Sequence, residues 1–148
     1  MPTHYAGTQQ ERRALDIFIK LLRAARAMSE WTGDAIAQSG LTDSQFGVLE
    51  TLYHLGPLLA SQLADKHLKS RNNLTVIIDN LEKRGFVRRE RDLHDRRAIP
   101  IHLTEVGRET VARALPEFAE VVSRRVGVLT TDEQEVLGTL LRKLGRQD

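Results

Sequence analysis

The sequence predicts a mainly α-helical fold with one small antiparallel β hairpin, and two observations support this prediction. Both ends of the chain repeat apolar residues every three or four positions, as amphipathic helices do. In the middle, a short helical pattern stops at Gly85 and two alternating runs follow it, which is typical of a hairpin. The 148 residues contain no cysteine, which excludes disulfides and thiolate metal sites.

The first helix is expected over residues 11–38. Leu15, Phe18 and Leu22 recur at helical spacing within it. A helix of this length protrudes from a small domain unless another chain covers it. We therefore expect residues 1–40 to form an N-terminal dimerisation segment.

Two shorter helices are expected next. Thr42-x-x-Gln45 has the form of a capping box and opens a helix that ends near Leu55. A short strand at residues 58–59 and a brief helix over residues 60–67 follow. The brief helix and the one after it, joined by a tight turn, would form a helix-turn-helix unit.

The second helix of that unit is expected over residues 70–84. Ser70 is well suited as its N-cap, so its first turn would present free N–H groups to phosphates. The helix-turn-helix and the hairpin behind it are placed in one domain, residues 41–104. One apolar stripe of this helix must pack on the preceding helices, and it consists of Leu74, Ile77, Ile78 and Leu81.

The hairpin is expected to pair residues 86–91 with residues 99–103 around a charged loop at residues 92–97. Between Lys66 and Arg97, ten Lys and Arg residues stand against five Asp and Glu residues, whereas the rest of the chain carries 12 basic and 15 acidic residues. A helix fits the major groove of duplex DNA, and a basic hairpin reaches a neighbouring groove or the phosphates. The sequence therefore predicts double-stranded DNA as a partner.

Residues 105–148 are predicted to form a C-terminal helical dimerisation segment. Pro116 lies inside its first helical pattern and predicts a kink or a local break. Thr131-x-x-Gln134 has the form of a second capping box and opens the last helix. Apolar faces at both ends of the chain need partners, so the simplest arrangement is a homodimer with interlocking termini.

Two segments carry a further pattern: GPLLASQLADKHLKSRNNLTVIIDNLEKRGFVRR from Gly56 and DLHDRRAIPIHLTEVG from Asp92. The second includes Asp-Arg-Arg at residues 95–97 and Leu-Thr-x-x-Gly at residues 103–107. Both resemble the multiple-antibiotic-resistance-regulator (MarR) family of winged helix-turn-helix transcription factors, although Val76 stands where members often carry a polar or basic residue. The resemblance implies an obligate homodimer, a pseudo-palindromic operator and repression relieved by a small, often aromatic or phenolic ligand. The lack of cysteine excludes the branch that senses peroxide through a thiol.

The predicted DNA-binding residues lie on the second helix of the unit and in the hairpin loop. Asn72 and Asn73 can pair bidentately with adenine, and Arg71 with guanine or a phosphate. Arg96 or Arg97 can enter a narrow minor groove, and the resemblance favours Arg97. The full set, in which Asp95 is expected to orient basic side chains, is Lys69, Ser70, Arg71, Asn72, Asn73, Thr75, Val76, Asn80, Lys83, Arg84, Asp95, Arg96 and Arg97.

A site for a small aromatic effector is expected where the long helices meet the helix-turn-helix, because a ligand there changes the spacing of the two DNA-reading heads. The candidate lining residues are Met28, Trp31, Phe46, Tyr53 and His54, with Trp31 favoured. The alternative is that these side chains are simply part of the core.

Other functions find less support in the sequence. The five histidines lack HxH or HExxH spacing, so no metal is expected. The absence of a Gly-rich phosphate loop and of a Gly-x-Ser-x-Gly elbow argues against an enzyme or a bound cofactor. No apolar run approaches the roughly 20 residues that span a bilayer, so a cytoplasmic protein without membrane contact is expected. A regulator that acts by occupancy without a ligand, and a winged helix that binds only proteins, stay open as alternatives.

Overall fold

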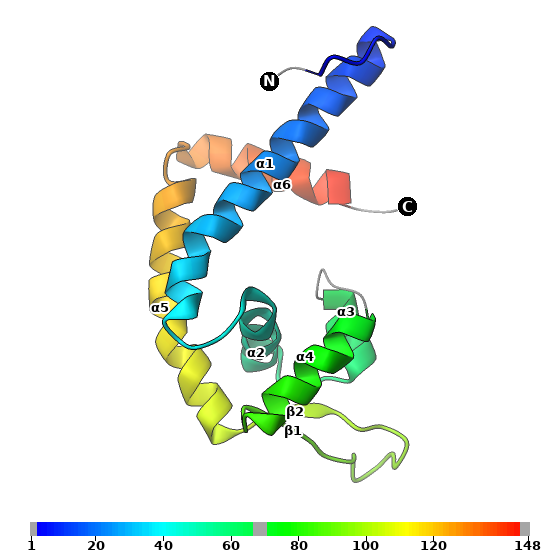
Figure 1. Cartoon of the computed structure of the whole chain (residues 1–148), viewed down its shortest axis with the longest axis vertical. Helices are drawn as coiled ribbons and strands as arrows, with labels where there is room; N and C mark the ends of the chain where they lie inside the picture. Colours follow the sequence, from blue (N-terminus) through cyan, green and yellow to red (C-terminus); the bar gives the residue numbers. More distant parts are fainter. Residues whose placement is uncertain (1–2, 67–70, 146–148) are drawn as a thin grey trace. The chain divides into compact units, whose positions relative to one another are not determined.

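The computed structural model describes residues 3–66 and 71–145, except for the side chains at positions 71 and 72. Within these residues the chain forms helices α1 (Gln9–Ala37), α2 (Asp43–Leu55), α3 (Ala60–Lys66), α4 (Arg71–Lys83), α5 (Glu105–Val126) and α6 (Thr131–Gly145), and strands β1 (Val87–Arg89) and β2 (Ile101–Leu103) (Figure 1). The mainly α fold with a small β hairpin is thereby confirmed.

The chain divides into two compact units, which are described separately. The central unit is Gly33–Phe118, and the terminal unit combines Met1–Thr32 with Ala119–Asp148. Both boundaries fall inside helices, α1 and α5, whereas the sequence places them at residues 40 and 104. The last turns of α1 and the first half of α5 belong to the central unit because their buried side chains, including Ile36 and Val111, join its core.

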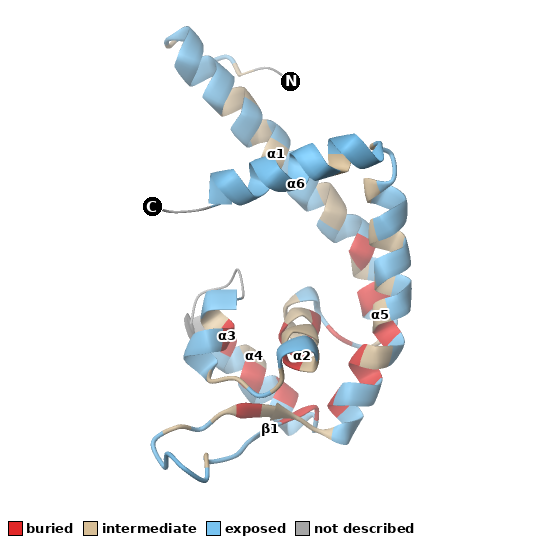
Figure 2. Cartoon of the chain, turned by 180° about the vertical axis from the view of Figure 1, so that it is seen from behind, coloured by how far each residue is buried: buried red, intermediate tan, exposed pale blue. Residues whose placement is uncertain are grey.

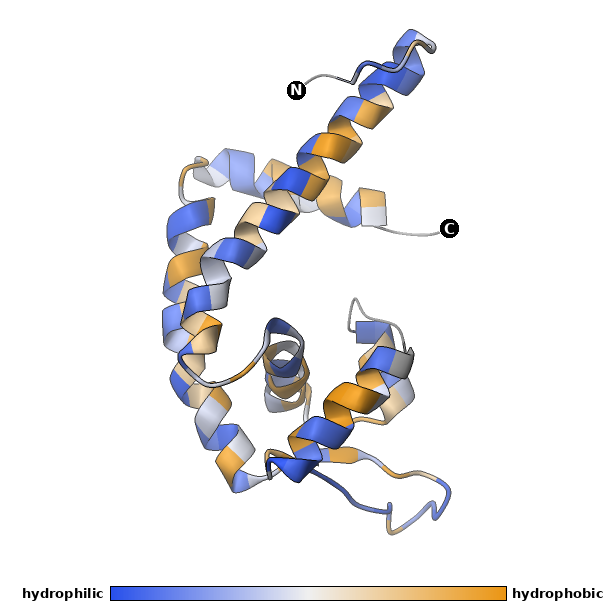
Figure 3. Cartoon of the chain, in the orientation of Figure 1, coloured by the Kyte–Doolittle hydropathy of each residue, from blue (hydrophilic) through white to orange (hydrophobic). Residues whose placement is uncertain are grey.

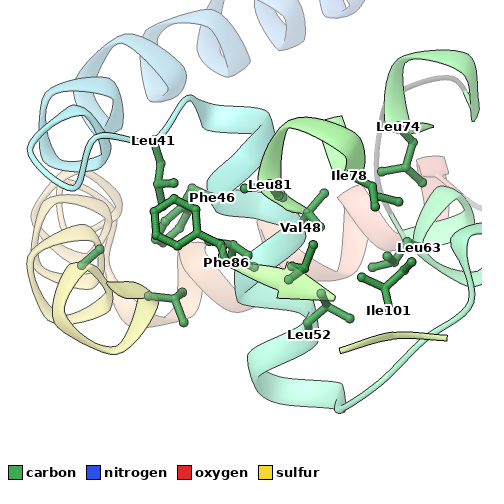
Figure 4. Packing of buried hydrophobic residues seen from close by; sticks show 14 of the residues in the cluster. Leu41, Phe46, Val48, Leu52, Leu63, Leu74, Ile78, Leu81, Phe86 and Ile101 are labelled. Atoms are coloured by element: carbon green, nitrogen blue, oxygen red, sulfur yellow. The ribbon is translucent and has the colours of Figure 1, made fainter. Parts of the chain in front are cut away.

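The core of the central unit is built from α2, α3, α4 and the hairpin, closed by α5 (Figure 4). Leu74, Ile78 and Leu81 of α4 are fully buried, as the apolar stripe predicts, and Ile77 is half-buried. Burial of one such side chain contributes roughly 1.5–3 kcal/mol. The stripe therefore fixes which face of α4 turns toward solvent.

The capping box at the start of α2 is confirmed. The Oγ1 of Thr42 accepts a hydrogen bond from the Gln45 N–H, and the Thr42 N–H donates to Oε1 of Gln45. The helix ends at Gly56, whose φ of 78° is readily adopted only by glycine and whose N–H donates to the Leu52 carbonyl.

The hairpin strands are shorter than the sequence predicts. Val87 pairs with Leu103 and Arg89 with Ile101, in antiparallel register. Two backbone hydrogen bonds continue the hairpin past the strands, from Glu90 N–H to the Pro100 carbonyl and from Asp92 N–H to the Ala98 carbonyl. The hairpin therefore begins and ends close to the predicted residues, although only three pairs form regular strand.

The strand predicted at residues 58–59 is wrong, because it is reduced to one antiparallel bridge. Leu58 exchanges both backbone hydrogen bonds with Ile101, at 3.3 and 2.7 Å between N and O atoms. Only four residues separate α2 from α3, which leaves no length for a strand. The bridge still fastens the start of the helix-turn-helix to β2.

The start of α5 is tied to the turn that follows α4. Thr104 caps α5: its Oγ1 accepts from Gly107 N–H and donates to the Gly85 carbonyl, and its N–H donates to the Phe86 carbonyl. A Cβ atom at Gly107 would lie 2.1 Å from the Phe86 carbonyl oxygen, which is far inside contact distance. In the Leu-Thr-x-x-Gly motif, the glycine is thus needed because a side chain would clash with Phe86, and the threonine is needed because its hydroxyl caps α5 and binds the Gly85 carbonyl.

Of the two outcomes expected at Pro116, the local break is wrong and the kink stays a prediction. α5 is continuous across Pro116, because proline removes only one hydrogen bond and the turn before it is anchored by buried Val111 and Ala114. The last helix is capped by Thr130 instead of Thr131, and the sequence motif was therefore read one residue too late.

The observed cap of α6 shows why the register is shifted. Thr130 N–H donates to Oε2 of Glu133 at 2.8 Å, and Glu133 N–H donates to Oγ1 of Thr130 at 3.3 Å. Gln134, the expected partner, instead donates its side-chain amide to the Leu129 carbonyl. A carboxylate near the N-terminus of a helix is favoured over an amide by the helix dipole.

The helices of the terminal unit leave their apolar side chains exposed. No residue of α6 is buried (Figure 2), although the helix carries a strongly apolar face (Figure 3). The exposed large side chains of α1 and α6 include Ile17, Phe18, Leu22, Val136, Leu137, Leu140, Leu141 and Leu144. None of the helices in the described part of the chain has the length and apolar character to cross a membrane.

Candidate nucleic-acid interface

The solvent-facing side of α4 carries polar and small apolar groups on a rigid helix. Asn73, Val76, Asn80 and Lys83 are exposed, with 59% of Val76 accessible. Because the opposite stripe of α4 is locked in the core, these side chains keep a fixed direction. Of the other predicted residues on this helix, Thr75 is also exposed. Lys69, Ser70 and the side chains of Arg71 and Asn72 lie outside the described residues.

The loop of the hairpin is ordered by its own aspartates. Oδ1 of Asp92 accepts the backbone N–H of His94 at 2.7 Å and of Asp95 at 3.3 Å. These hydrogen bonds lower the pKa of Asp92 below its usual value. Oδ1 of Asp95 accepts the backbone N–H of Arg97 at 3.0 Å. The Asp95 carboxylate thus holds the loop backbone at Arg97, and its orientation of basic side chains stays a prediction.

Arg96 and Arg97 are exposed at this loop and form no ion pair with any residue that the structure describes. β1 lies beside α4 and pairs with β2, and the loop between the strands extends away from the helices (Figure 1). Two guanidinium groups thus project from a hairpin that is anchored next to the exposed face of α4. This juxtaposition is suited to contacting one groove with the helix and phosphates or a second groove with the loop.

Arg89 of β1 clamps the hairpin to α4. Its Nη2 donates to Oδ1 of Asp79 at 2.6 Å, and its Nη1 donates to Oε1 of Glu82 at 2.9 Å. Its backbone N–H donates to the other oxygen of Glu82 at 2.9 Å. Burial opposes the charge of this guanidinium, but the hydrogen bonds and charges of Asp79 and Glu82 outweigh it and raise the pKa of Arg89. We refer to these three residues as the wing clamp.

Sequence reasoning counted Arg89 only as one more positive charge. The sequence did offer one sign that Arg89 has a structural partner. Two carboxylates, Asp79 and Glu82, lie on the exposed side of a helix that otherwise suits DNA. Acidic groups there repel phosphates unless a cation covers them. Arg89 pairs with both carboxylates, so the wing clamp fixes the hairpin and reduces the repulsion that these carboxylates would exert on a phosphate.

Arg84 also has internal partners, although it was predicted to contact DNA. Its Nη1 donates to Oε1 of Gln45 at 3.2 Å, and its guanidinium lies 4.8 Å from the centre of the Phe86 ring. Arg88 donates to Glu90 and to the Leu103 carbonyl. The basic window therefore contains structural arginines beside those that are open to phosphate.

The five residues proposed to line an effector site belong to different units. Met28 and Trp31 lie in the terminal unit, where the Arg125 guanidinium stands 4.2 Å from the centre of the Trp31 ring. Phe46, Tyr53 and His54 lie in the central unit.

Phe46 is buried in the core of the central unit, and its ring centre lies 4.9 Å from that of Phe118. Tyr53 packs edge-on against His54, with the Arg108 guanidinium 5.8 Å from its ring centre. Phe46 is therefore a core side chain, which is the alternative that the sequence analysis left open. The assignment of the five residues to an effector site stays a prediction. Among the described residues no group of three His, Asp or Glu side chains is arranged to hold a metal ion.

Comparison with known proteins adds independent findings. The model of the MarR family matches residues 41–99. YkoM of Bacillus subtilis, an uncharacterised HTH-type transcriptional regulator, is 34% identical over 137 residues, covering 93% of this chain and 89% of YkoM. The structure superposes on AbsC of Streptomyces coelicolor, a MarR family transcriptional regulator, with a TM-score of 0.81 and 26% identity over 96% of this chain and 95% of that one. It also matches BpsR of Bordetella bronchiseptica, whose DNA binding is regulated by 6-hydroxynicotinic acid, with a TM-score of 0.79 and 26% identity over 100% of both chains.

Proposed function

Because this chain belongs to the MarR family of transcriptional regulators, we propose that it is a homodimeric repressor that binds a pseudo-palindromic operator and leaves it when a small aromatic ligand binds. The observation that carries the DNA-binding part of this proposal is the wing clamp. It joins a helix with an exposed, amide-bearing face to a hairpin whose loop presents Arg96 and Arg97.

In this proposal α4 reads the major groove and the hairpin loop reaches the minor groove. Asn73 pairs with adenine, and Val76 contacts a thymine methyl group. Lys83 contacts phosphate and so sets register without reading sequence. Arg97, or Arg96 beside it, enters the minor groove, where the negative potential of a narrow groove favours arginine. The rest of the proposed DNA-binding set is Lys69, Ser70, Arg71, Asn72, Thr75, Asn80, Arg84 and Asp95.

The apolar faces of the terminal unit support a homodimer. Leu140 and Leu144 of α6 are 56% and 62% exposed, as are Phe18 and Leu22 of α1 at 55% and 53%. Contiguous apolar surface of this kind mostly marks an interaction site. A second copy of the chain supplies a matching face, since a two-fold interface places the same patch on both subunits. Two such subunits would read half-sites about 10 bp apart, centre to centre.

The ligand-responsive part of the proposal is supported by a relative. BpsR, which matches this chain over its whole length, is regulated in its DNA binding by 6-hydroxynicotinic acid, an aromatic acid. The alternative for this chain is a regulator that acts by occupancy alone. It would bind the same DNA, and no aromatic acid would weaken that binding.

A titration tests the proposal. The purified protein is added to labelled DNA from upstream of its own gene, at several salt concentrations, with and without aromatic acids. We expect tight binding that falls steeply with salt, because released counterions drive the association. Arg97→Ala is expected to weaken binding to every sequence and lower the salt slope, whereas Asn73→Ala relaxes preference at one base pair. If both variants bind like the parent protein, α4 and the loop are not the DNA face.

A further inference from the structure

The loop of the hairpin carries a fully exposed leucine. Leu93 is 95% exposed, the largest value for any large apolar side chain in the described part of the chain. It takes no part in the core of the central unit, so nearly all of its apolar surface stays in water, which is unfavourable. Folding of the chain therefore does not explain a leucine at this position.

Hydrogen bonds within the loop fix the backbone around Leu93. Oδ1 of Asp92 accepts the N–H groups of His94 and Asp95, and so holds Leu93 in a tight turn. Asp92 N–H donates to the Ala98 carbonyl at 3.0 Å and closes the loop, and Ala98 N–H donates to the Asp95 carbonyl at 3.0 Å. The exposed leucine is therefore presented by an ordered turn.

The charges around Leu93 indicate what kind of surface covers it. Leu93 and Arg97 stand at matching positions on the two arms of the loop, each one residue inside the hydrogen-bonded pair that closes it. The acidic neighbours Asp92 and Asp95 are engaged with loop backbone. Arg96 and Arg97 are exposed and form no ion pair with any described residue. Charge complementarity therefore favours a polyanion as the partner of this loop.

Both strands of the hairpin are anchored to the central unit. The wing clamp ties β1 to α4 through Arg89. Leu58, just before α3, ties β2 to the helix-turn-helix through two backbone hydrogen bonds with Ile101. A side chain on this loop can therefore press on DNA without displacing the hairpin.

We propose that Leu93 is an apolar wedge that enters the minor groove beside Arg97 and partly unstacks one base step in each half-site. Insertion of a leucine or another apolar side chain between base pairs kinks the duplex. This proposal rests on the proposed function, since the wedge needs α4 and the loop on DNA. It adds a source of sequence preference at a step that no hydrogen bond reads.

The wedge selects base steps that unstack easily. The pyrimidine–purine steps TA and CA/TG are flexible and readily kinked, whereas A-tracts are stiff. Leu93 therefore favours a TA or CA/TG step under each loop. Arg97 favours a narrow minor groove instead, so the two residues select different features of neighbouring DNA.

Permanganate footprinting tests the wedge, because permanganate oxidises thymine most readily when the base is unstacked. Every TA and CA/TG step contains a thymine on at least one strand, so the whole operator is scanned. The full-length protein is added at saturating concentration to DNA from upstream of its own gene. We expect enhanced reactivity at one step in each half-site for the parent protein.

Three variants separate the wedge from the rest of the loop. Leu93→Ala removes most of the side chain and should abolish the enhanced reactivity at full occupancy, whereas Leu93→Met keeps a long apolar side chain and should retain it. Leu55→Ala is the matched control, since Leu55 is an exposed leucine of the same unit outside the proposed DNA face. Circular dichroism should show all three variants folded, because each change lies at an exposed side chain.

Affinity gives a second measure of the wedge. Leu93→Ala should weaken operator binding about tenfold, because burying a leucine side chain is favourable and unstacking offsets part of the gain. The salt slope should stay that of the parent, since no charge is lost, whereas Arg97→Ala lowers it. When the flexible step is replaced by AA, the difference between the parent and Leu93→Ala should disappear.

The outcomes separate the wedge from the proposed function. A bound parent protein without enhanced reactivity at any thymine overturns the wedge and leaves the DNA-binding regulator standing. Equal reactivity for the parent and Leu93→Ala does the same and leaves Leu93 to a protein partner. A parent protein that binds no DNA above the non-specific level refutes the proposed function and the wedge with it.

Discussion

The central and terminal units use the same kind of amphipathic helix in opposite ways. In α4, Leu74, Ile78 and Leu81 are no more than 1% exposed. In α6, Leu140 and Leu144 lie at equivalent helical spacing and stay more than half exposed. An amphipathic sequence therefore does not distinguish a helix whose apolar face is covered by its own chain from one whose apolar face stays exposed on that chain. Only the packing of the central unit separates the two cases.

The two units also differ in their proposed roles. The central unit holds its own core and positions the proposed DNA face, so its folding is encoded in one chain. In the proposed homodimer, the exposed apolar surface of the terminal unit is used for association. Substitutions in the two units should accordingly affect different measurements, folding and positioning in the first and assembly in the second.

The largest effect is expected in the core of the central unit. Leu81→Ala removes a fully buried side chain, and such truncations cost roughly 2–5 kcal/mol of the free energy of unfolding. Urea unfolding at constant protein concentration measures it. Val76→Ala, on the exposed side of the same helix, is the control and should change stability by less than about 0.5 kcal/mol. Equal losses in the two variants would contradict the assignment of inner and outer faces.

The next effect concerns assembly. Leu140→Asp places a charge on the exposed apolar face of α6 and should dissociate the dimer, because burying an unpaired charge is strongly unfavourable. Sedimentation measures the mass over a range of concentrations, and circular dichroism should show the central unit still folded. A variant that sediments like the parent would show that α6 lies outside the interface.

A smaller effect is expected at the wing clamp. Glu82→Gln keeps the shape of the side chain but removes its charge, so it loosens the hold on Arg89 and leaves Asp79 as the remaining anion. We expect DNA binding to weaken several-fold with little change in unfolding, since the pair is partly exposed. Glu90→Gln, which releases Arg88 on the same hairpin, is the control. A Glu82→Gln variant that binds DNA like the control would remove the positioning role.

The smallest effect is a local one in the loop. The pKa of Asp92 is held below its usual value of 3.8 by hydrogen bonds from His94 and Asp95, so its carboxylate orders the loop at neutral pH. Because the folded-state pKa is lowered, this order is lost only as the pH falls below that usual value. Backbone amide signals of His94 and Asp95 should shift in that acidic range, and Asp92→Asn should abolish the shift.

Local structure was largely readable from the sequence, and tertiary structure was not. The capping box at Thr42, the apolar stripe on α4 and the glycine after it could be predicted from the spacing of nearby residues in the sequence. The cap of α6 was misplaced by one residue because Thr130 and Thr131 both have a polar residue three positions on.

The features that depend on distant residues were missed. The wing clamp joins Arg89 to Asp79 across the turn, a contact that no periodicity marks. Short-range patterns thus predicted most of the helices and the hairpin, whereas the clamp results from packing.

Hydroxyl-radical footprinting of the protein on DNA from upstream of its own gene tests the central claim most directly, with Leu140→Asp as the comparison. The account predicts two symmetric protected regions about 10 bp apart for the parent protein, and loss of the paired pattern for the variant with its central unit still folded. A single protected region for the parent, unchanged by Leu140→Asp, would contradict the division of the chain into a DNA-reading unit and an assembling unit.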